Sequence, residues 1–246
     1  MSLPVHLVPS LDGVSVGSLV HVDGDEAHHA VAVRRMRVGE ALLLTDGRGA
    51  LAEGAVEATG KRTLEVRVTS YDVVAEPAPS VTVVQALAKG DRGERAVEVL
   101  TEIGAARIVP WAAARSVAVW RGERAAKSLG RWRATAREAA KQSRRAWHPE
   151  VAGLASTDDV LETVAAAELS VVLHEEATGS IASLAVPEAG PVVVVVGPEG
   201  GLTDDELAAL VAAGAHAVRL GAEVLRTSTA GVAATAAILA RTPRWT

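Results

Sequence analysis

The stretch VVVVVGPEGGLTDDEL, residues 192–207, constrains the fold of this chain most strongly. Five consecutive valines are typical of a strand that is buried on both faces, as in a parallel sheet covered by helices. A glycine turn follows, and Thr203 with Glu206 three residues later forms the capping-box pattern that begins a helix. A strand, a loop and a helix in this order predict an α/β domain with a ligand site at the carboxyl end of the strand.

Glycine loops of this kind often bind phosphate, but this loop has the wrong charge. It matches neither the P-loop pattern Gly-x4-Gly-Lys-Ser/Thr nor the dinucleotide fingerprint Gly-x-Gly-x-x-Gly. It contains Glu199, and Asp204, Asp205 and Glu206 follow directly. These carboxylates would repel a polyanion, so we expect a neutral or cationic ligand. The alternative is an ordinary tight turn before a helix whose dipole favours acidic residues.

The proline-rich segment VVAEPAPS, residues 73–80, separates two different patterns. Before it, short apolar runs divided by glycine turns predict a small β-barrel, with one possible helix at DEAHHAVAVRRM. After it, alternating strands and helices predict a parallel sheet covered on both faces. We therefore expect two domains, residues 1–74 and 75–246. The α/β part is predicted to contain strands at VTVVQALA, RIVPW, LSVVLHE, PVVVVVG and HAVRL and helices at DRGERAVEVLTEIGA, 122–146, 204–213 and 230–240.

Composition excludes several kinds of site. The chain has no Cys, which excludes disulfides, thiolate metal sites and a cysteine nucleophile. His28 and His29 are adjacent and would not face one site in regular structure, so no metal is expected. The start MSLPVHLVPS lacks the features of a signal peptide, and no apolar run approaches the roughly 20 residues of a membrane helix. We expect a cytoplasmic protein that does not bind membranes.

Positive charge is concentrated in one part of an acidic chain. Residues 115–145 contain ten basic and two acidic residues, whereas the whole chain has a net charge of −5. Arg133, Arg137, Lys141 and Arg145 recur every four residues and would form one stripe on a helix, which Arg144 widens. Contact with RNA phosphates is the favoured interpretation, and a solvated charged face is the alternative. The cluster VRRMR at 33–37 allows the same two interpretations.

A second loop, in RLGAEVLRTSTAG, follows the last predicted strand. Leu220 and Gly221 leave the strand, and residues 224–230 are predicted to form a loop rich in small and hydroxyl side chains. The helix after it is nearly all Ala and Val, so backbones can approach closely. If the two loops leave neighbouring strands, they form a binding site built largely of main chain.

With these two loops, the chain resembles the ribosomal small subunit methyltransferase E family of the SPOUT superfamily. The blocks VVVVVGPEGGLTDDEL and RLGAEVLRTSTA carry the resemblance, and VQALAKGDRGERAVEVLTEIGAARIVPW, ARSVAVW and RWRATAREAAKQSRRAWHPEV extend it in the family's order. It implies a PUA-like β-barrel that binds RNA at residues 1–74 and a SPOUT-type parallel sheet with a trefoil knot at 75–246. It also implies S-adenosylmethionine (AdoMet) as cofactor, a homodimer, and 16S rRNA of the small ribosomal subunit as the partner, methylated at uridine N3.

The resemblance also implies the functional residues. Arg226 is the catalytic candidate, as a stabiliser of the uracil anion; closing the AdoMet loop or pairing across the dimer are its alternatives. Glu199 becomes a plausible neighbour of the sulfonium cation. The residues expected to bind AdoMet are Leu173, His174, Gly197, Pro198, Glu199, Gly200, Gly201, Leu220, Gly221, Leu225, Ser228, Thr229 and Ala230. The residues expected to bind RNA are Arg34, Arg35, Lys89, Arg115, Arg133, Arg137, Lys141, Arg144 and Arg145.

The chain departs from the family pattern at three positions. Glu223 stands where the family usually has Arg, Ser228 where it has Glu, and Val99 near a usual Lys. Mechanisms that rest on those side chains are therefore in doubt, whereas the glycine loops are intact. Two alternative functions stay open: another SPOUT RNA methyltransferase, acting on ribose 2′-OH or on tRNA, and a non-catalytic RNA-binding ribosome-assembly factor.

Overall fold

The computed structural model describes residues 3–245, which form two compact units. The first unit extends to Glu76 and also includes Ala140–His148; the second consists of Pro77–Ala139 and the chain from Pro149 onward. Residues 140–148 thus lie in the first unit, although the expected division at residue 74 assigns them to the second domain. Each unit has its own hydrophobic core.

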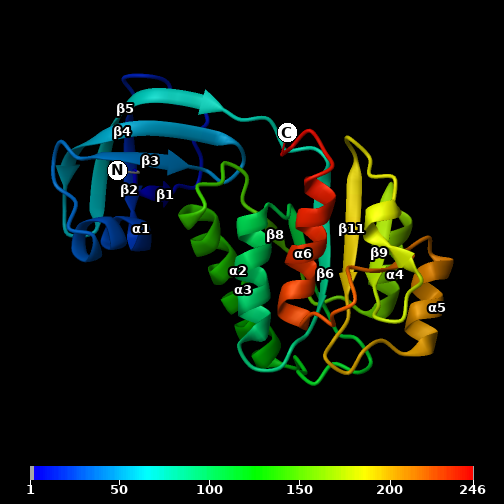
Figure 1. The fold of residues 1–246 in the computed structure, drawn as a ribbon. Helices are drawn as coiled ribbons and strands as arrows, with labels where there is room; N and C mark the ends of the chain where they lie inside the picture. The colour runs from blue at the N-terminus through cyan, green and yellow to red at the C-terminus, as the bar shows by residue number, and fades with distance from the viewer. Residues whose placement is uncertain (1–2, 246) are drawn as a thin grey trace. The chain divides into compact units, whose positions relative to one another are not determined.

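The second unit is built on a seven-stranded sheet in which every pairing is parallel (Figure 1). The strand order is β10-β12-β9-β11-β6-β7-β8, so β11 lies at the centre of the sheet. The strands are β6 (Ser80–Ala86), β7 (Arg107–Trp111), β8 (Glu150–Val151), β9 (Leu169–Leu173), β10 (Gly179–Ser180), β11 (Pro191–Val196) and β12 (His216–Arg219).

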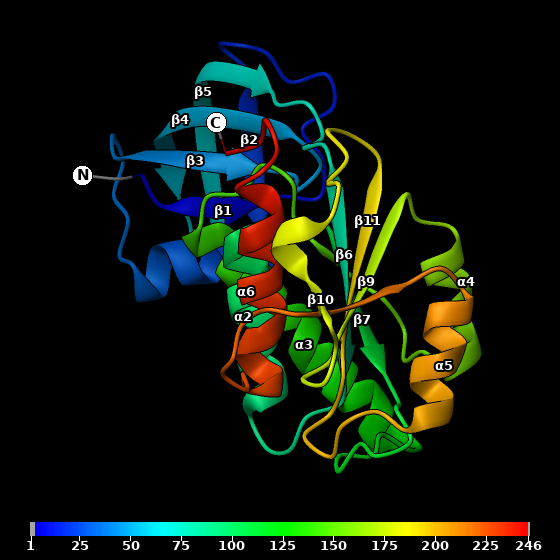
Figure 2. The same cartoon turned by 45° about the vertical axis from the view of Figure 1, so that its right-hand side comes forward.

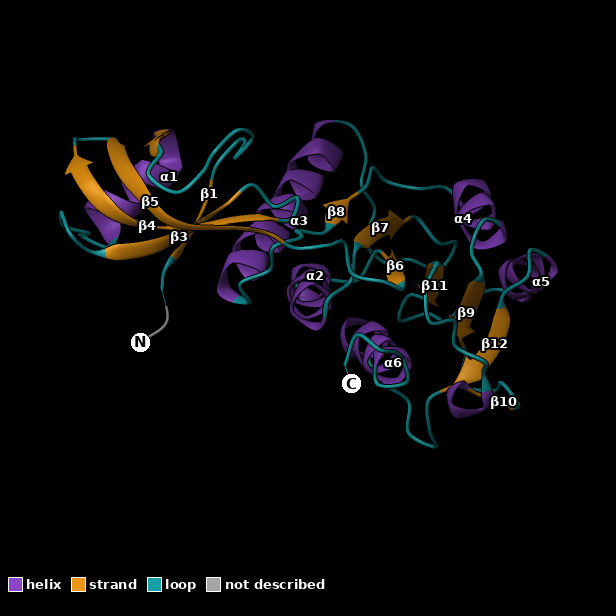
Figure 3. Ribbon diagram, turned by 90° about the horizontal axis from the view of Figure 1, so that it is seen from above, coloured by secondary structure: helices purple, strands orange, loops and turns teal. Residues whose placement is uncertain are grey.

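Helices cover both faces of this sheet. They are α2 (Arg92–Ile103), α3 (Glu123–Gln142), α4 (Thr157–Ala165), α5 (Asp204–Ala212), α6 (Thr227–Leu239) and the short 3₁₀ turn η2 (Ile181–Ser183). One core cluster joins α2, α3 and α6 to one face of the sheet, and a second joins α4 and α5 to the other. Figure 3 shows α2 and α6 on the side of the sheet opposite α4 and α5. The predicted α/β fold with a parallel sheet is confirmed.

The first unit is a curled five-stranded sheet with the order β1-β3-β4-β5-β2 (Figure 2). Only β1 and β3 pair in parallel; the other neighbours are antiparallel. The elements are β1 (Val5–Leu7), β2 (Leu19–Asp23), α1 (Gly24–His28), the π-helix η1 (His29–Val33), β3 (Ala41–Thr45), β4 (Ala50–Thr59) and β5 (Thr63–Val73). The helix expected at DEAHHAVAVRRM is present as α1 and η1. Among the described residues, the edge strands β1 and β2 do not pair with each other, so the small β-barrel takes the form of a curled sheet.

Two predicted helices need correction, and four elements were not predicted. The basic helix was predicted to span 122–146, but α3 ends at Gln142. Arg144 has a left-handed φ of 54°, which is incompatible with a right-handed α-helix. The helix predicted at 230–240 begins earlier, at Thr227. The sequence interpretation also missed β1, β8, β10 and α4, although α4 begins with a capping box between Ser156 and Asp159.

Residues 140–148 are attached to the first unit by hydrogen bonds and one buried ion pair. Gly49 N donates to the Ala146 carbonyl at 3.0 Å, and His148 N donates to the Gly47 carbonyl at 2.9 Å. Lys141 is 7% exposed, and its Nζ lies 2.8 Å and 3.1 Å from the two carboxylate oxygens of Glu26. A buried ammonium without a partner would destabilise the folded state. The Glu26 carboxylate therefore stabilises Lys141 in this position.

Two ionisable groups around this attachment have altered pKa values. Burial opposes ionisation of Glu26, but His6 and Lys141 beside it outweigh burial and lower its pKa from 4.5 to about 2. Burial, together with the positive charges of Arg145 and Lys141, lowers the pKa of His148 from 6.5 to about 4. The folded chain therefore favours ionised Glu26 and neutral His148.

We expect the His148→Gln variant to lose less stability than the wild type as the pH falls from 6.5 to 4. In that range the unfolded wild-type chain binds a proton at His148 that the folded chain does not, so the free energy of unfolding falls by about 1–3 kcal/mol. Urea unfolding of both proteins across this range measures the difference. An equal decline in both proteins would show that His148 does not titrate in this way.

Candidate functional site

A cavity of about 330 Å³ opens in the second unit at the carboxyl ends of β9, β11 and β12. Its walls come mainly from the segments that leave these strands, residues 173–175, 196–202 and 218–227. The two loops were expected to leave neighbouring strands, but β9 lies between β11 and β12 in the sheet. The site therefore includes a third strand exit, at Leu173 and His174, between the two loops.

The glycine loop after β11 is held in a tight turn. Gly201 N donates to the Pro198 carbonyl at 2.9 Å, and Gly201 has a φ of +71°, which glycine adopts without strain. Thr203 and Glu206 form the predicted capping box at the start of α5. Glu206 is buried and also accepts a hydrogen bond from Ala114 N at 2.8 Å. The loop is thus tied both to its own helix and to the segment after β7.

Arg115 supports the same loop from outside. Its Nη1 donates to the Leu202 carbonyl at 3.0 Å. A side-chain carbon at Gly200 would lie 3.0 Å from the Arg115 carbonyl oxygen, so a larger residue here would require the loop or Arg115 to shift. Arg115 was predicted to bind RNA, and the structure instead places its guanidinium against the main chain of the glycine loop.

Glu199 points its carboxylate toward the segment between β6 and α2. Its Oε1 accepts hydrogen bonds from Lys89 N at 3.1 Å and from Arg92 Nη1 at 3.3 Å. Burial raises the pKa of Glu199, but the backbone amides of Glu199 and Lys89 and the Arg92 guanidinium outweigh burial and lower the pKa below its ordinary value. Glu199 is therefore ionised at neutral pH and joins two loops of the site.

The second loop ends where α6 begins. Val224 is 76% exposed and Leu225 39% exposed, and Arg226 is the N-cap residue of α6. The first residue of the helix, Thr227, is buried, and its carbonyl accepts a hydrogen bond from Gln85 Nε2 at 3.3 Å. Gln85, at the end of β6, thereby fixes the start of α6 beside the cavity.

Most residues predicted to bind the ligand line this cavity. Those that line it are Leu173, His174, Gly197, Pro198, Glu199, Gly201, Leu220, Gly221, Leu225, Arg226 and Ala230. Gly200, Ser228 and Thr229 are not among the lining residues. Ser228 is buried because the helix starts before it, and Thr229 Oγ1 donates to the Arg226 carbonyl at 3.3 Å.

Several lining residues were not predicted. They include Arg92, Glu175, Val196, Leu202, Val218, Arg219, Ala222, Glu223, Val224 and Thr227. Arg92 could have been found, because it opens a helix directly after a strand that was predicted to belong to the same sheet. Glu223 was noted only as a departure from the family pattern, and it lies at the edge of the cavity.

The predicted basic stripe is interrupted at Lys141, which is buried. Arg137 is exposed, and the Arg133 Nε donates to the Val151 carbonyl at 3.2 Å. Lys141 is buried against Glu26, and Arg144 and Arg145 lie beyond the end of α3. In the first unit, Arg34 and Arg35 are exposed, and Arg35 has a left-handed φ of 56°.

Residues 3–245 contain neither a cluster of metal ligands nor a helix that could cross a membrane. No group of three or more His, Cys, Asp or Glu side chains in this part of the chain is arranged to hold a metal ion. None of its helices is long and apolar enough to cross a membrane.

Comparisons with known proteins agree with one another. Residues 75–239 match the family described as RNA methyltransferase domain, and residues 22–69 match the RNA methyltransferase PUA domain. Ribosomal RNA small subunit methyltransferase E of Mycobacterium bovis (strain ATCC BAA-935 / AF2122/97) is 52% identical over 233 residues, which cover 93% of this chain and 89% of that protein. The protein of the same name from Bacillus subtilis (strain 168) is 32% identical, with 88% of each chain covered.

A solved structure is similar over nearly the whole chain. It is a ribosomal RNA small subunit methyltransferase E from Neisseria gonorrhoeae bound to S-adenosyl methionine, with a TM-score of 0.86 and 28% identity. The match covers 97% of this chain and 98% of that one.

We expect Arg115→Ala to loosen the glycine loop without unfolding the second unit. The change removes a hydrogen bond worth about 1 kcal/mol, so amides of residues 197–203 should exchange roughly fivefold faster in hydrogen-exchange measurements. Arg121→Ala, at an exposed position six residues along the same segment, is the control. Unchanged exchange in the glycine loop would contradict the support role.

Proposed function

Since the chain belongs to the ribosomal RNA small subunit methyltransferase E family, we propose that it transfers a methyl group from AdoMet to N3 of a uridine in 16S rRNA. The observation that carries this proposal is the main-chain cavity at the carboxyl ends of β9, β11 and β12. The relative from Neisseria gonorrhoeae, which matches along almost the entire chain, was solved with S-adenosyl methionine.

The residues of the cavity fit AdoMet. The volume of about 330 Å³ lies within the range of small-ligand sites. Leu173, Val218 and Leu220 offer apolar surface for an adenine ring. The charged lining residues are three acids and three bases, which suits a ligand that carries both charges: Glu175, Glu199, Glu223, Arg92, Arg219 and Arg226.

The reaction is an in-line displacement in which AdoMet supplies the methyl group and its sulfur leaves as a neutral thioether. No acid is needed for that leaving group, so positioning contributes most of the acceleration. The difficulty lies in the nucleophile, because uridine N3 carries a proton. When this proton leaves to solvent, negative charge spreads over the uracil oxygens O2 and O4, and the enzyme must stabilise it.

Arg226 is proposed to stabilise this charge. It lines the cavity and is exposed, and within residues 3–245 its guanidinium has no hydrogen-bond or ion-pair partner. It also caps the N-terminus of α6, where the helix dipole places partial positive charge. A guanidinium beside a helix N-terminus is suited to a developing anion.

His174 is poorly suited to act as a general base that removes the N3 proton. Its Nδ1 accepts a hydrogen bond from Glu176 N at 3.3 Å, so the nitrogen that would accept a proton is already engaged. Solvent is therefore the proposed acceptor of the N3 proton.

Exposed basic residues are proposed to bind the rRNA. Arg34 and Arg35 lie in the unit that contains the PUA match, and Arg137 lies on α3. The trefoil knot and the homodimer, both implied by the resemblance, also stay proposals.

The proposed reaction is tested on small ribosomal subunits from a deletion strain. Mass spectrometry should show that their 16S rRNA lacks N3-methyluridine, and incubation with the protein and AdoMet should restore it. In single-turnover reactions, Arg226→Ala should lower the methyl-transfer rate by about 100-fold while AdoMet binding is retained. Arg95→Ala, exposed on α2 and paired with Glu98, is the control and should react like the wild type.

Two results would contradict this proposal in different ways. If N3-methyluridine persists in the deletion strain, the proposed target is wrong. If Arg226→Ala transfers the methyl group at the wild-type rate, Arg226 has no role in stabilising the anion, and its alternatives at the loop or across a dimer are favoured.

Arg137→Ala should weaken RNA binding in a way that depends on salt. Loss of one phosphate contact should reduce the slope of log affinity against log salt by about 0.7–0.9. Filter binding of 16S rRNA across a salt series measures the slope, with Arg95→Ala as the matched control. An unchanged slope for Arg137→Ala would remove α3 from the RNA-binding surface.

A further inference from the structure

The ion pair of Arg92 and Glu199 lies on the wall of the cavity. Each side chain keeps hydrogen-bonding groups that the pair does not use. Arg92 Nη1 lies 3.3 Å from Glu199 Oε1, and the side chains are 40% and 23% exposed. Within the described residues, the guanidinium has no other side-chain partner, and Glu199 Oε2 accepts no hydrogen bond from another residue. One positive and one negative group therefore remain able to bind a ligand.

The pair is held in place before any ligand arrives. Lys89 N donates to the same Oε1 at 3.1 Å, which fixes the carboxylate from the β6 side. Arg92 is the first residue of α2, so its backbone is fixed by the helix. A prearranged pair loses little conformational freedom on binding, which favours affinity.

Three apolar lining residues and the Arg92–Glu199 pair lie on different strands. Leu173, Val218 and Leu220 belong to β9, β12 and the exit from β12. Glu199 follows β11, and Arg92 follows β6, which are the next two strands of the sheet. The ion pair therefore lies apart from these three apolar side chains.

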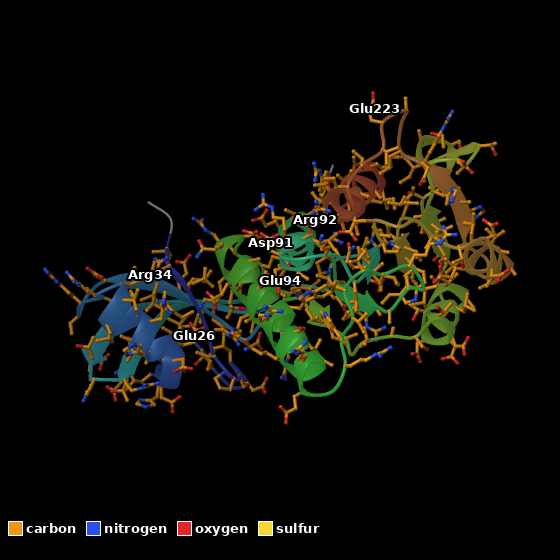
Figure 4. The ribbon with its side chains drawn as sticks, turned by 90° about the horizontal axis from the view of Figure 1, so that it is seen from below. Glu26, Arg34, Asp91, Arg92, Glu94 and Glu223 are labelled. Atoms are coloured by element: carbon orange, nitrogen blue, oxygen red, sulfur yellow. The ribbon has the colours of Figure 1, made fainter. Side chains whose placement is uncertain are left out.

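Of the acidic residues at the start of α2, Glu94 is engaged by another residue. Glu94 is paired with Arg131 at 3.3 Å. Figure 4 shows Arg92 beside Asp91 and Glu94 at the start of α2, with Glu223 apart from them on the loop before α6. Arg92 and Glu199 form the only ion pair found between cavity-lining residues in the described part of the chain.

We infer that the Arg92–Glu199 pair binds the amino-acid end of AdoMet. This end is a zwitterion. Its α-carboxylate can accept hydrogen bonds from the free N–H groups of Arg92, and its α-ammonium can donate to Oε2 of Glu199. The adenosine then lies toward β9 and β12, where Leu173, Val218 and Leu220 lie. The inference rests on the proposed function, because it assumes that AdoMet occupies this cavity.

A zwitterion matches the pair better than a phosphate or a lone cation does. A phosphate would gain from Arg92 but would be repelled by the ionised Glu199 close beside it. A lone sulfonium would gain from Glu199 and would be repelled by Arg92. Only a ligand with both charges satisfies both residues, and charge-assisted hydrogen bonds of this kind are among the stronger polar contacts.

Three ligands separate the parts of AdoMet. S-adenosylhomocysteine keeps the amino-acid end and lacks the sulfonium charge, and 5′-methylthioadenosine lacks both. Calorimetric titration of each ligand is done with the full-length wild type, Arg92→Gln, Glu199→Gln and the control Arg95→Gln. Thermal unfolding of each variant verifies that it is folded.

Arg92→Gln should bind AdoMet and S-adenosylhomocysteine about tenfold more weakly and bind 5′-methylthioadenosine within about twofold of the wild type. Glu199→Gln keeps an acceptor for Lys89 N. It should weaken the binding of AdoMet and of S-adenosylhomocysteine to the same extent. Arg95→Gln should change none of them.

The outcomes that overturn the inference are distinct. An equal loss for all three ligands, or no loss in Arg92→Gln, would show that Arg92 does not bind the amino-acid end. A loss confined to AdoMet in Glu199→Gln would assign Glu199 to the sulfonium instead of the ammonium. If the wild type binds none of the ligands, the proposed cofactor fails and the inference fails with it.

Discussion

The pairing of β11 between β9 and β6 is the interaction on which the site depends. Val192–Val196 are at most 2% exposed, with alternate side chains in the two core clusters on opposite faces of the sheet. Burial of each valine contributes about 1.5–3 kcal/mol, so this strand cannot shift without disrupting both cores. Its carboxyl end is therefore a fixed point, and the glycine loop begins there.

Close packing of α6 brings the second half of the site to the same point. A side-chain carbon at Gly231 would lie 3.2 Å from both Leu100 Cδ2 and Val196 Cγ2, so glycine lets α6 approach β11 and α2 closely. The hydrogen bond from Gln85 then fixes Thr227 at the start of the helix. Arg226 is held at the cavity because the helix behind it cannot move away from the sheet.

Local patterns predicted much of this fold. The valine run, the capping box at Thr203 and Glu206, and the C-cap at Gly104 with a φ of +104° are each decided by neighbouring residues. Contacts between distant residues were not predictable in this way. The strand order that places β9 between β11 and β12 is one example, and the pairing of Lys141 with Glu26, 115 residues apart, is another.

For the candidate site too, local features were predictable and contacts between distant residues were not. Charge alone excluded phosphate, and most of the glycine-loop residues line the cavity as expected. Arg92 was missed because its link to Glu199 spans 107 residues, and Ser228 was misplaced because α6 begins one turn earlier than its alanine-rich pattern indicated. Sequence therefore indicated the loops that line the cavity, and tertiary contacts decided which of their side chains line it.

A crystal structure of the protein with S-adenosylhomocysteine tests the central claim most directly. The account predicts the adenosine at the carboxyl ends of β9, β11 and β12, with the amino-acid end within hydrogen-bond distance of Arg92 and Glu199. A ligand bound outside this cavity would contradict the account.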